Sequence, residues 1–412
     1  MNEKSSLMVK FSLPLLFILS CLSLVAKDWP TFGGIFRNHS SNEEGLRTNW
    51  NGNEPDILWK IDIGLGYSSV VEHRGKAISQ GYENGRNTLF CLDAEKGTVL
   101  WKHQYPCKKA PDYFQGGTRA TPTVHEDKVY ILSHEGDLYA LDLENGKVEW
   151  SVNVVADLAG ERPQWGFAGA PLVVDDKVIV QKGGKKGSLV ALEASTGSVV
   201  WQAGSEGAGY ASPYLRANHK EIVVFNQFGL MLHRLSDGEV LSKYQHKTRY
   251  GINAAQPLEY QNRFLISSAY GKGAALVRAE KNRMQSIWES DQISSQMASL
   301  VRKEKVAFGI HGQAGTRSRH ATLFCLEIET GVKKWEEKGF GVGTIILVDE
   351  ILVILSDDGA LTLAHANSEK FEEIDSFQVL PGKNNWTPPT YANGRMHCRS
   401  SQGQWVCLNM GQ

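Results

Sequence analysis

The sequence has no marked excess of positive or negative charge. Its 412 residues include 44 Lys and Arg and 45 Asp and Glu, so the formal net charge is -1. A chain this balanced gives no electrostatic basis for binding nucleic acid or an anionic membrane surface. We therefore expect no nucleic-acid partner.

The usual motifs of catalysis and metal binding are also missing. The sequence contains no His-Glu-x-x-His, no Gly-x-Ser-x-Gly and no paired-cysteine zinc pattern. Lys182 to Ser188 (KGGKKGS) lacks the spacing of a phosphate loop and is interpreted as a hairpin turn. His311 to His320 holds two His and two Arg without an identifiable third metal ligand, so we expect a solvated insertion. Nothing in the sequence proposes a nucleophile.

Long apolar runs are scarce, and the clearest one lies at the N-terminus. Phe11 to Ala26 (FSLPLLFILSCLSLVA) comes after Lys4 and Lys10 and is followed by Lys27. A basic start, a short apolar stretch and a small final residue are typical of a secretory signal. The run is short for a membrane span. We expect residues 1–26 to be a signal peptide, and the protein to be exported, periplasmic or extracellular, without a transmembrane span.

A lipid anchor stays open as an alternative to release. Ile18 to Cys21 resembles a lipoprotein cleavage box, but Leu19 is bulky for its place and the residues after Cys21 stay apolar. Lipidation of Cys21 would tether the protein to a membrane.

What the sequence has in abundance is one repeated phrase. Its copies share Leu, an apolar residue, Ala or Cys, Leu, an acid, three variable residues, Gly, three more and Trp. They read LFCLDAEKGTVLW at 89–101, LYALDLENGKVEW at 138–150, LVALEASTGSVVW at 189–201 and LFCLEIETGVKKW at 323–335. Self-similarity at a long fixed period determines the architecture before local patterns do.

Each copy predicts a meander of four short strands. In the clearest copy the segments are Thr121 to Val124, Lys128 to Ser133, Asp137 to Asp142 and Lys147 to Val152, separated by short polar turns. No stretch of similar length has a 3.6-residue apolar period. The chain is therefore predicted to be all-β.

Counting the degraded copies gives eight blades. Worn copies lie at 232–242, 276–288 and 348–377, and the last copy, at 387–409, lacks its fourth strand. A strand of that type occurs alone near the N-terminus, at 56–63 (DILWKIDI). Four-stranded units every ~40–50 residues are typical of propellers, and a front strand that completes the last blade closes the ring. We predict one eight-bladed β-propeller domain over residues 27–412.

The repeated residues are predicted to be scaffold. Each Gly should adopt a turn conformation with φ > 0, and each Trp should pack between neighbouring blades. Cys91, Cys325 and Cys407 occupy a repeat position that Ala holds elsewhere, so we expect small buried side chains. Cys398 and Cys407 flank a predicted hairpin turn and would lie opposite each other, so a disulfide between them stays open.

The phrase resembles the repeat of the pyrroloquinoline-quinone-like (PQQ-like) β-propeller family over roughly Trp29 to Asn409. The N-terminal segment of the domain, from DWPTFGGIFRNHSS to GLGYSSV, is similar to that of exported bacterial members of the family. The resemblance implies either a quinoprotein alcohol or sugar dehydrogenase, with PQQ and Ca²⁺ on the axis, or a non-catalytic platform like the outer-membrane β-barrel assembly lipoprotein. The chain lacks the adjacent Cys-Cys pair of the alcohol dehydrogenases and a clear Glu, Asn and Asp set for Ca²⁺.

Ligands of propellers sit at the mouth of the central channel, where loops lead into the innermost strands. The residues there that do not repeat are Tyr67, Arg119, Trp165, Tyr210, Asn253, Gln296 and Trp386. Aromatic faces with Arg, Asn and Gln donors suit a planar or sugar-like ligand. The same side chains would equally serve as a plug of the channel, and both interpretations stay open.

We predict a monomeric, exported, non-catalytic propeller that binds a partner protein or a small ligand at the mouth, without a cofactor. The alternative is a compact PQQ-dependent alcohol or sugar dehydrogenase that uses PQQ and Ca²⁺ at the same mouth.

Overall fold

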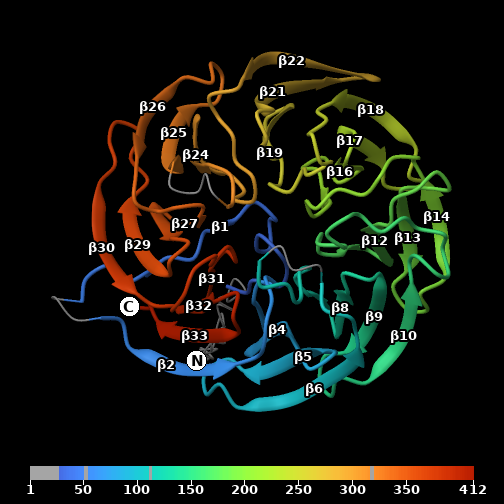
Figure 1. Cartoon of the computed structure of the whole chain (residues 1–412), viewed down its shortest axis with the longest axis horizontal. Coiled ribbons are helices and arrows are strands. Elements are labelled where there is room, and N and C mark those ends of the chain that lie inside the picture. The colour runs from blue at the N-terminus through green and yellow to red at the C-terminus, as the bar shows by residue number, and fades with distance from the viewer. Residues whose placement is uncertain (1–26, 51–53, 111–113, 316–319) are drawn as a thin grey trace, which may run out of the picture.

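The structure is a ring of eight β-sheets around a central channel (Figure 1). It is a computed structural model and describes residues 27–50, 54–110, 114–315 and 320–412. Each blade is an antiparallel meander of four strands, as the repeat predicts, and one blade gains a short parallel strand at its inner edge. Within these residues, no helix is long and apolar enough to cross a membrane. The expected signal peptide and Cys21 lie outside the described residues.

The first four blades follow one another along the chain. Blade 1 contains β3 (Val71–His73), β4 (Lys76–Glu83), β5 (Arg86–Asp93) and β6 (Val99–Pro106). Blade 2 contains β7 (Thr123–His125), β8 (Lys128–Leu132), β9 (Asp137–Asp142) and β10 (Val148–Asn153). Blade 3 contains β11 (Leu172–Val174), β12 (Lys177–Gln181), β13 (Leu189–Glu193) and β14 (Val199–Ala203). Blade 4 contains β15 (Tyr214–Leu215), β16 (Glu221–Phe225), β17 (Gly229–Arg234) and β18 (Val240–Gln245).

The remaining blades complete the circle. Blade 5 contains β19 (Leu258–Tyr260), β20 (Arg263–Ser268), β21 (Gly273–Glu280) and β22 (Arg283–Ser290). Blade 6 contains β23 (Val301–Lys303), β24 (Val306–His311), β25 (Thr322–Glu327) and β26 (Lys333–Glu337). Blade 7 contains β27 (Thr344–Val348), β28 (Ile351–Leu355), β29 (Ala360–His365) and β30 (Glu373–Gln378). Blade 8 contains β31 (Thr390–Ala392), β32 (Arg395–Arg399), β33 (Gln404–Asn409) and, from the N-terminus, β2 (Ile57–Asp62).

The ring closes where the sequence predicts. β2 pairs antiparallel with β33, with Trp59 opposite Cys407 and Asp62 opposite Gln404. The N-terminal strand therefore supplies the outermost strand of the last blade. The prediction of an eight-bladed propeller closed by 56–63 is confirmed.

The repeated Trp side chains join each blade to the next, as predicted for scaffold. Six indole N–H groups each donate to a backbone carbonyl of the following blade, at 2.9–3.2 Å. The donors are Trp59, Trp101, Trp150, Trp201, Trp288 and Trp335, and their acceptors are Ala94, Leu143, Ala194, Leu235, Ile328 and Asn367. The same contact repeated around the ring sets the spacing of the blades.

The repeated Gly is required for the same contact. Gly146 has φ 71°, and a Cβ there would lie 2.4 Å from the ring of Trp101. Gly97 and Gly197 repeat this arrangement beneath Trp59 and Trp150. The residue must be Gly both for its left-handed backbone and for the room that the indole occupies.

The five cysteines of the described residues are free and buried. Cys398 pairs with Val406 in the ladder, and Cys407 pairs with His397. Our expectation that Cys398 and Cys407 lie opposite each other is therefore wrong. They are one residue out of register, and successive side chains of a strand point to opposite faces of the sheet, so the two thiols belong to different hydrophobic clusters.

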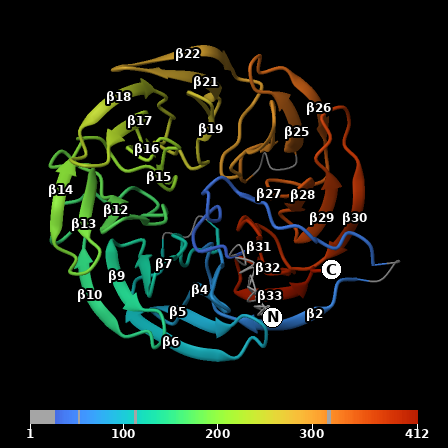
Figure 2. The same cartoon turned by 180° about the vertical axis from the view of Figure 1, so that it is seen from behind.

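An element that we did not predict lies inside the ring. Residues 28–43, which we call the N-terminal strap, run across the channel at the end where the innermost strands finish. Trp29 pairs with Glu72 of β3, and β1 (Ser40–Ser41) adds in parallel to β27. Figure 2 shows the blue N-terminal segment running from the centre of the ring outward to its rim. We call this end of the propeller the back face, and the end where the innermost strands begin the mouth face.

Candidate functional site

The candidate site is the channel mouth, because connections between blades converge there. Each outermost strand ends at the mouth face and leads into the innermost strand of the next blade. The seven residues singled out in the sequence all lie on these connections or at the start of the innermost strands. The structure brings them into three groups, which differ in what the side chains do.

The first group is an aromatic cluster where blades 8 and 1 meet. The rings of Tyr67 and Trp386 stack with centroids 5.4 Å apart, and Phe114 packs edge-on against Trp386 at 4.5 Å. The Tyr67 hydroxyl donates to Gln115 Oε1 at 2.7 Å, and Asn384 donates to the same oxygen at 3.3 Å. Phe114 is still 38% exposed. The cluster fills this side of the mouth and presents one aromatic edge to solvent.

The second group lies between blades 2 and 4 and combines a cation with aromatic side chains. Burial lowers the pKa of Arg119 and raises the pKa values of Tyr67 and Tyr210, which are electrostatically coupled to it. The Tyr210 hydroxyl accepts a hydrogen bond from the backbone N–H of Trp165 at 3.2 Å. Arg119 is thus a partly buried guanidinium that interacts electrostatically with the phenol groups of Tyr67 and Tyr210.

The third group is structural. Asn253 is fully buried, and its amide nitrogen donates to the carbonyls of Asn226 and His246 at 2.7 and 3.0 Å. Its amide oxygen accepts from the Ser268 hydroxyl at 2.7 Å. Through these bonds the side chain joins blade 4 to blade 5.

Gln296 is engaged in a similar way. Its amide nitrogen donates to the Tyr270 hydroxyl at 3.0 Å, and its amide oxygen accepts from the backbone N–H of Ala314 at 2.7 Å. The side chain holds the start of the 311–320 insertion, part of which lies outside the described residues. The amide groups of Asn253 and Gln296 both bond to neighbouring parts of the chain.

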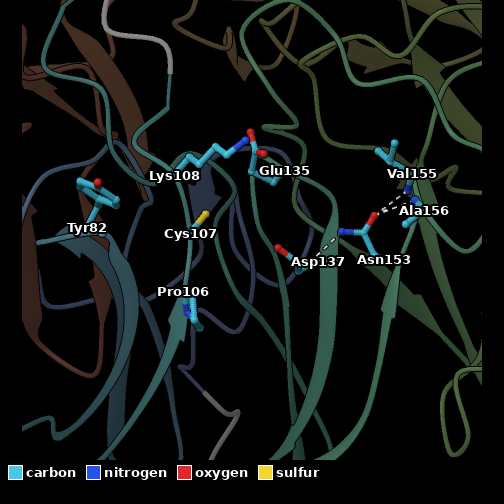
Figure 3. Close-up of a pocket in the computed structure, with 10 residues that line it drawn as sticks. Tyr82, Pro106, Cys107, Lys108, Glu135, Asp137, Asn153, Val155 and Ala156 are labelled. Atoms are coloured by element: carbon cyan, nitrogen blue, oxygen red, sulfur yellow. Dashed lines mark hydrogen bonds between the residues drawn. The ribbon is translucent and has the colours of Figure 1, made fainter.

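An open cavity of about 650 Å³ lies beside the mouth, between blades 1 and 2 (Figure 3). Figure 3 shows Cys107 between Lys108 and Pro106 on one wall, with Asp137 and Asn153 on the other. Asn153 donates to Asp137 at 2.8 Å. The walls come from two blades, so the cavity is a groove across their junction.

The thiol in this groove is not set up as a nucleophile. Cys107 Sγ lies 3.8 Å from His134 Nδ1. Burial, with the nearby carboxylates, raises the pKa of Cys107 to about 12. Burial, with Arg119 and Arg162, lowers the pKa of His134 to about 4. Both groups are neutral at pH 7, and it is the thiolate that attacks electrophiles or binds metals.

A second cavity, of about 380 Å³, opens where blades 3 and 4 meet the connection to blade 5. Phe228 lines it, with Lys243 Nζ 4.9 Å and Lys247 Nζ 5.8 Å from the ring centroid. Nearby, Tyr250 is 46% exposed. Both cavities therefore flank the channel mouth and carry charged groups next to apolar ones.

The family model described as outer membrane protein assembly factor BamB matches residues 85–337, more than half of the chain. The chain belongs to the BamB family. No curated relative matches it by sequence.

Solved structures share the fold of this BamB-family chain at low identity. BamB from Moraxella catarrhalis is 16% identical with a TM-score of 0.61, and the match covers 87% of this chain and 98% of that one. Quinohemoprotein alcohol dehydrogenase from Comamonas testosteroni is 13% identical with a TM-score of 0.64, covering 94% and 81%. A europium-containing methanol dehydrogenase is 12% identical with a TM-score of 0.67, covering 92% and 89%. The PQQ-like recognition is confirmed.

The mouth does not fit a quinone and its metal ion well. Within the described residues, no three His, Cys, Asp or Glu side chains gather as a metal site would require. The stacked rings of Tyr67 and Trp386 cover each other and leave no slot between them for a flat cofactor. We therefore derive no chemical step through such a group.

The seven residues chosen from the sequence lie on the mouth face, whereas the strap on the back face was not predicted. The strap has no repeat and no alternation, and its contacts are with residues far along the chain. The signals it did offer were Trp29, Gly33 and Gly34 in a short stretch: both glycines have φ near 79°, and Gly34 lies against the Trp29 ring.

Proposed function

We propose that this chain is an exported, non-catalytic propeller that binds a partner protein on its mouth face. The observation that carries the proposal is the aromatic cluster of Tyr67, Trp386 and Phe114, whose rings pack on one another instead of lining a slot. Such a cluster forms a well-packed surface on which the Phe114 ring is partly exposed to solvent. Aromatic residues and Arg dominate the energetics of protein interfaces.

The grooves beside the mouth support a protein partner over a small ligand. They open at two places on the mouth face, and the exposed rings of Phe114 and Tyr250 lie on connections of that same face. Two open grooves next to a filled mouth suit a surface that receives several side chains at once. A small ligand would instead be expected in one deep, largely enclosed pocket.

Export is part of the proposal and rests on the sequence. The basic residues Lys4 and Lys10, the apolar run 11–26 and the polar residues after it support a secretory signal.

The test removes two mouth side chains together. Trp165→Ala with Arg119→Ala should weaken binding of the partner isolated with the wild-type protein by about tenfold or more, while the melting temperature stays nearly unchanged. Leu100→Ala, a substitution of a half-exposed side chain on β6, is the matched control and should leave binding intact. A large loss of stability in the double variant would instead identify these side chains as a plug of the channel.

The dehydrogenase alternative has its own test. Purified protein is mixed with PQQ and Ca²⁺, and quinone absorbance and dye-coupled alcohol or aldose oxidation are followed. We expect neither stoichiometric binding nor turnover. Stoichiometric binding with turnover would overturn the non-catalytic interpretation.

A further inference from the structure

The smaller of the two grooves on the mouth face, of about 380 Å³, is formed by three segments around blade 4. They are the connection that enters the blade, the turn between β16 and β17, and the connection that leaves the blade. Among the lining residues, Glu206 and Gly207 come from the first segment, Phe228 from the second, and Lys247 and Gly251 from the third. We call this cavity the basic groove.

Two lysine side chains lie against the aromatic ring of the basic groove. Lys243 Nζ and Lys247 Nζ are 4.9 and 5.8 Å from the centroid of the Phe228 ring. Arg249 follows two residues after Lys247 on the same connection, and all three basic residues are exposed. A cation–π contact holds an ammonium group in place but leaves its charge intact. The groove therefore presents fixed positive charge to solvent.

Carboxylates of the protein do not neutralise this charge. Among the described residues, Glu206 is the only acidic residue that lines the groove. Its Oε1 lies 3.8 Å from Lys243 Nζ, and its Oε2 accepts the backbone N–H of Ser205 at 2.8 Å. Within the same part of the chain, neither Lys247 nor Arg249 forms an ion pair. Three cations thus face one carboxylate, whose side chain is only 13% exposed.

The positive charge does not follow from the repeat. The larger groove is formed by the equivalent turn of blade 2 and the equivalent connections on either side of it. There the lining carries two carboxylates, Glu135 and Asp137, beside one lysine, Lys108 (Figure 3). Arg162 forms an ion pair with Glu135 at 3.0 Å. Because equivalent positions of two blades differ in charge, the cations of blade 4 are not needed by the scaffold.

We propose that the basic groove receives an acidic segment of the partner protein, whose Asp or Glu carboxylates pair with Lys243, Lys247 and Arg249. The inference rests on the proposed mouth-face interface and names the chemistry of the partner there. A single exposed ion pair contributes little, so one small anion would bind weakly. Several carboxylates on one chain act together, because each contact raises the effective concentration of the next. Complementary charge also speeds the encounter of the two proteins.

Calorimetric titration of the full chain with end-capped hexaglutamate, hexaglutamine and hexalysine, and with inorganic phosphate, tests the groove without the partner. We expect the wild type to bind hexaglutamate. Binding should weaken about tenfold or more between about 50 mM and about 500 mM NaCl, because salt screens exposed charges. Lys243→Gln with Lys247→Gln should weaken it by about tenfold or more at the lower salt concentration.

A matched control removes the same charge elsewhere. Lys60→Gln with Lys102→Gln changes two exposed lysines on the outer strands β2 and β6. Lys102 makes the same kind of contact as the groove lysines, with its Nζ 4.9 Å from the centroid of the Phe90 ring. This variant should bind hexaglutamate like the wild type.

Three outcomes overturn the proposal. They are no binding of hexaglutamate by the wild type, equal weakening in the groove and control variants, and binding of hexaglutamine, hexalysine or phosphate as tight as that of hexaglutamate. The partner itself separates this proposal from the mouth-face interface. If Trp165→Ala with Arg119→Ala abolishes partner binding but Lys243→Gln with Lys247→Gln does not, only the groove proposal fails. If the reverse holds, the groove is supported and the mouth residues are not.

Discussion

At the scale of single residues, the fold rests on a Gly and a Trp that meet across blades. The sequence predicted both roles correctly, because a residue that recurs in most blades is expected to make the contact that every pair of neighbouring blades needs. It could not predict which mouth residues are structural. From the sequence Asn253 is a candidate ligand-binding amide, but in the structure its amide nitrogen donates to the carbonyls of Asn226 and His246. Contacts of this kind depend on the assembled ring and leave no local pattern.

The Gly–Trp contact makes a quantitative prediction. Gly146→Ala should destabilise the protein by about 2–5 kcal/mol, because a left-handed Ala costs roughly 1–2 kcal/mol and crowding of the Trp101 ring adds roughly 1–3 kcal/mol. Gly271 has φ 75° with nothing within 4 Å of an added Cβ. Gly271→Ala should therefore cost only the backbone part. Urea denaturation of both variants measures the difference, and equal losses would show that the indole contact is unimportant.

The lowered pKa values of three buried histidines predict how the free energy of unfolding depends on pH. Burial lowers the pKa of His39 and of His134 to about 4, and that of His246 to about 3. In the unfolded chain the pKa of His is about 6.5, so the unfolded state binds more protons between these values. Stability contributed by the neutral imidazoles is complete above about pH 6.5 and is lost as the pH falls toward 4, by up to a few kcal/mol per group.

Urea midpoints at pH 7.5 and pH 5.5 provide the measurement for this dependence. The midpoint should fall at the lower pH, and His246→Gln should show a smaller fall than the wild type. Carboxyls with raised pKa values, such as Glu43 and Asp357, act in the opposite direction only at lower pH. A midpoint that rises on acidification to pH 5.5 would contradict the assignment of neutral buried histidines.

At the scale of elements, strands were predictable and the strap was not. Alternation and turns located blade 2 to within two residues at each strand boundary, and the missing last strand led to β2. The strap contains no such pattern. It is held by contacts with residues far along the chain, such as those of the Glu43 carboxylate, which accepts from the backbone N–H groups of Asn393 and Gly394 at 2.8 and 2.7 Å.

This anchor has a matched control in the next residue. Glu43→Ala leaves two partly buried N–H groups without their acceptor and should lower stability by about 1–2 kcal/mol. Glu44 is exposed, and Glu44→Ala should change stability by less than about 0.5 kcal/mol. Hydrogen exchange should show faster exchange across residues 28–43 in Glu43→Ala alone. Equal exchange in the two variants would mean that the strap is held by its other contacts.

At the scale of the whole molecule, the repeated blades form a closed ring. The segments outside the repeat make its two faces different. The back face is closed by the strap, whereas the mouth face carries the blade connections, the exposed aromatic edges and both grooves. A buried hydrogen-bond network also joins blade 8 to blade 1, where the ring closes. Glu72 of blade 1 accepts from Arg395 and from His397 Nε2 of blade 8, the latter at 2.8 Å.

The most direct test of the central claim is site-specific photo-crosslinking in the native host. A photoreactive amino acid is placed at Phe114 or Tyr250 on the mouth face, and at Leu58 or Val200 on the outer strands, where the side chains are similarly exposed. We predict that both mouth positions crosslink to the same protein and that both rim positions do not. Crosslinks to that protein from the rim alone, or none from the mouth, would contradict the account.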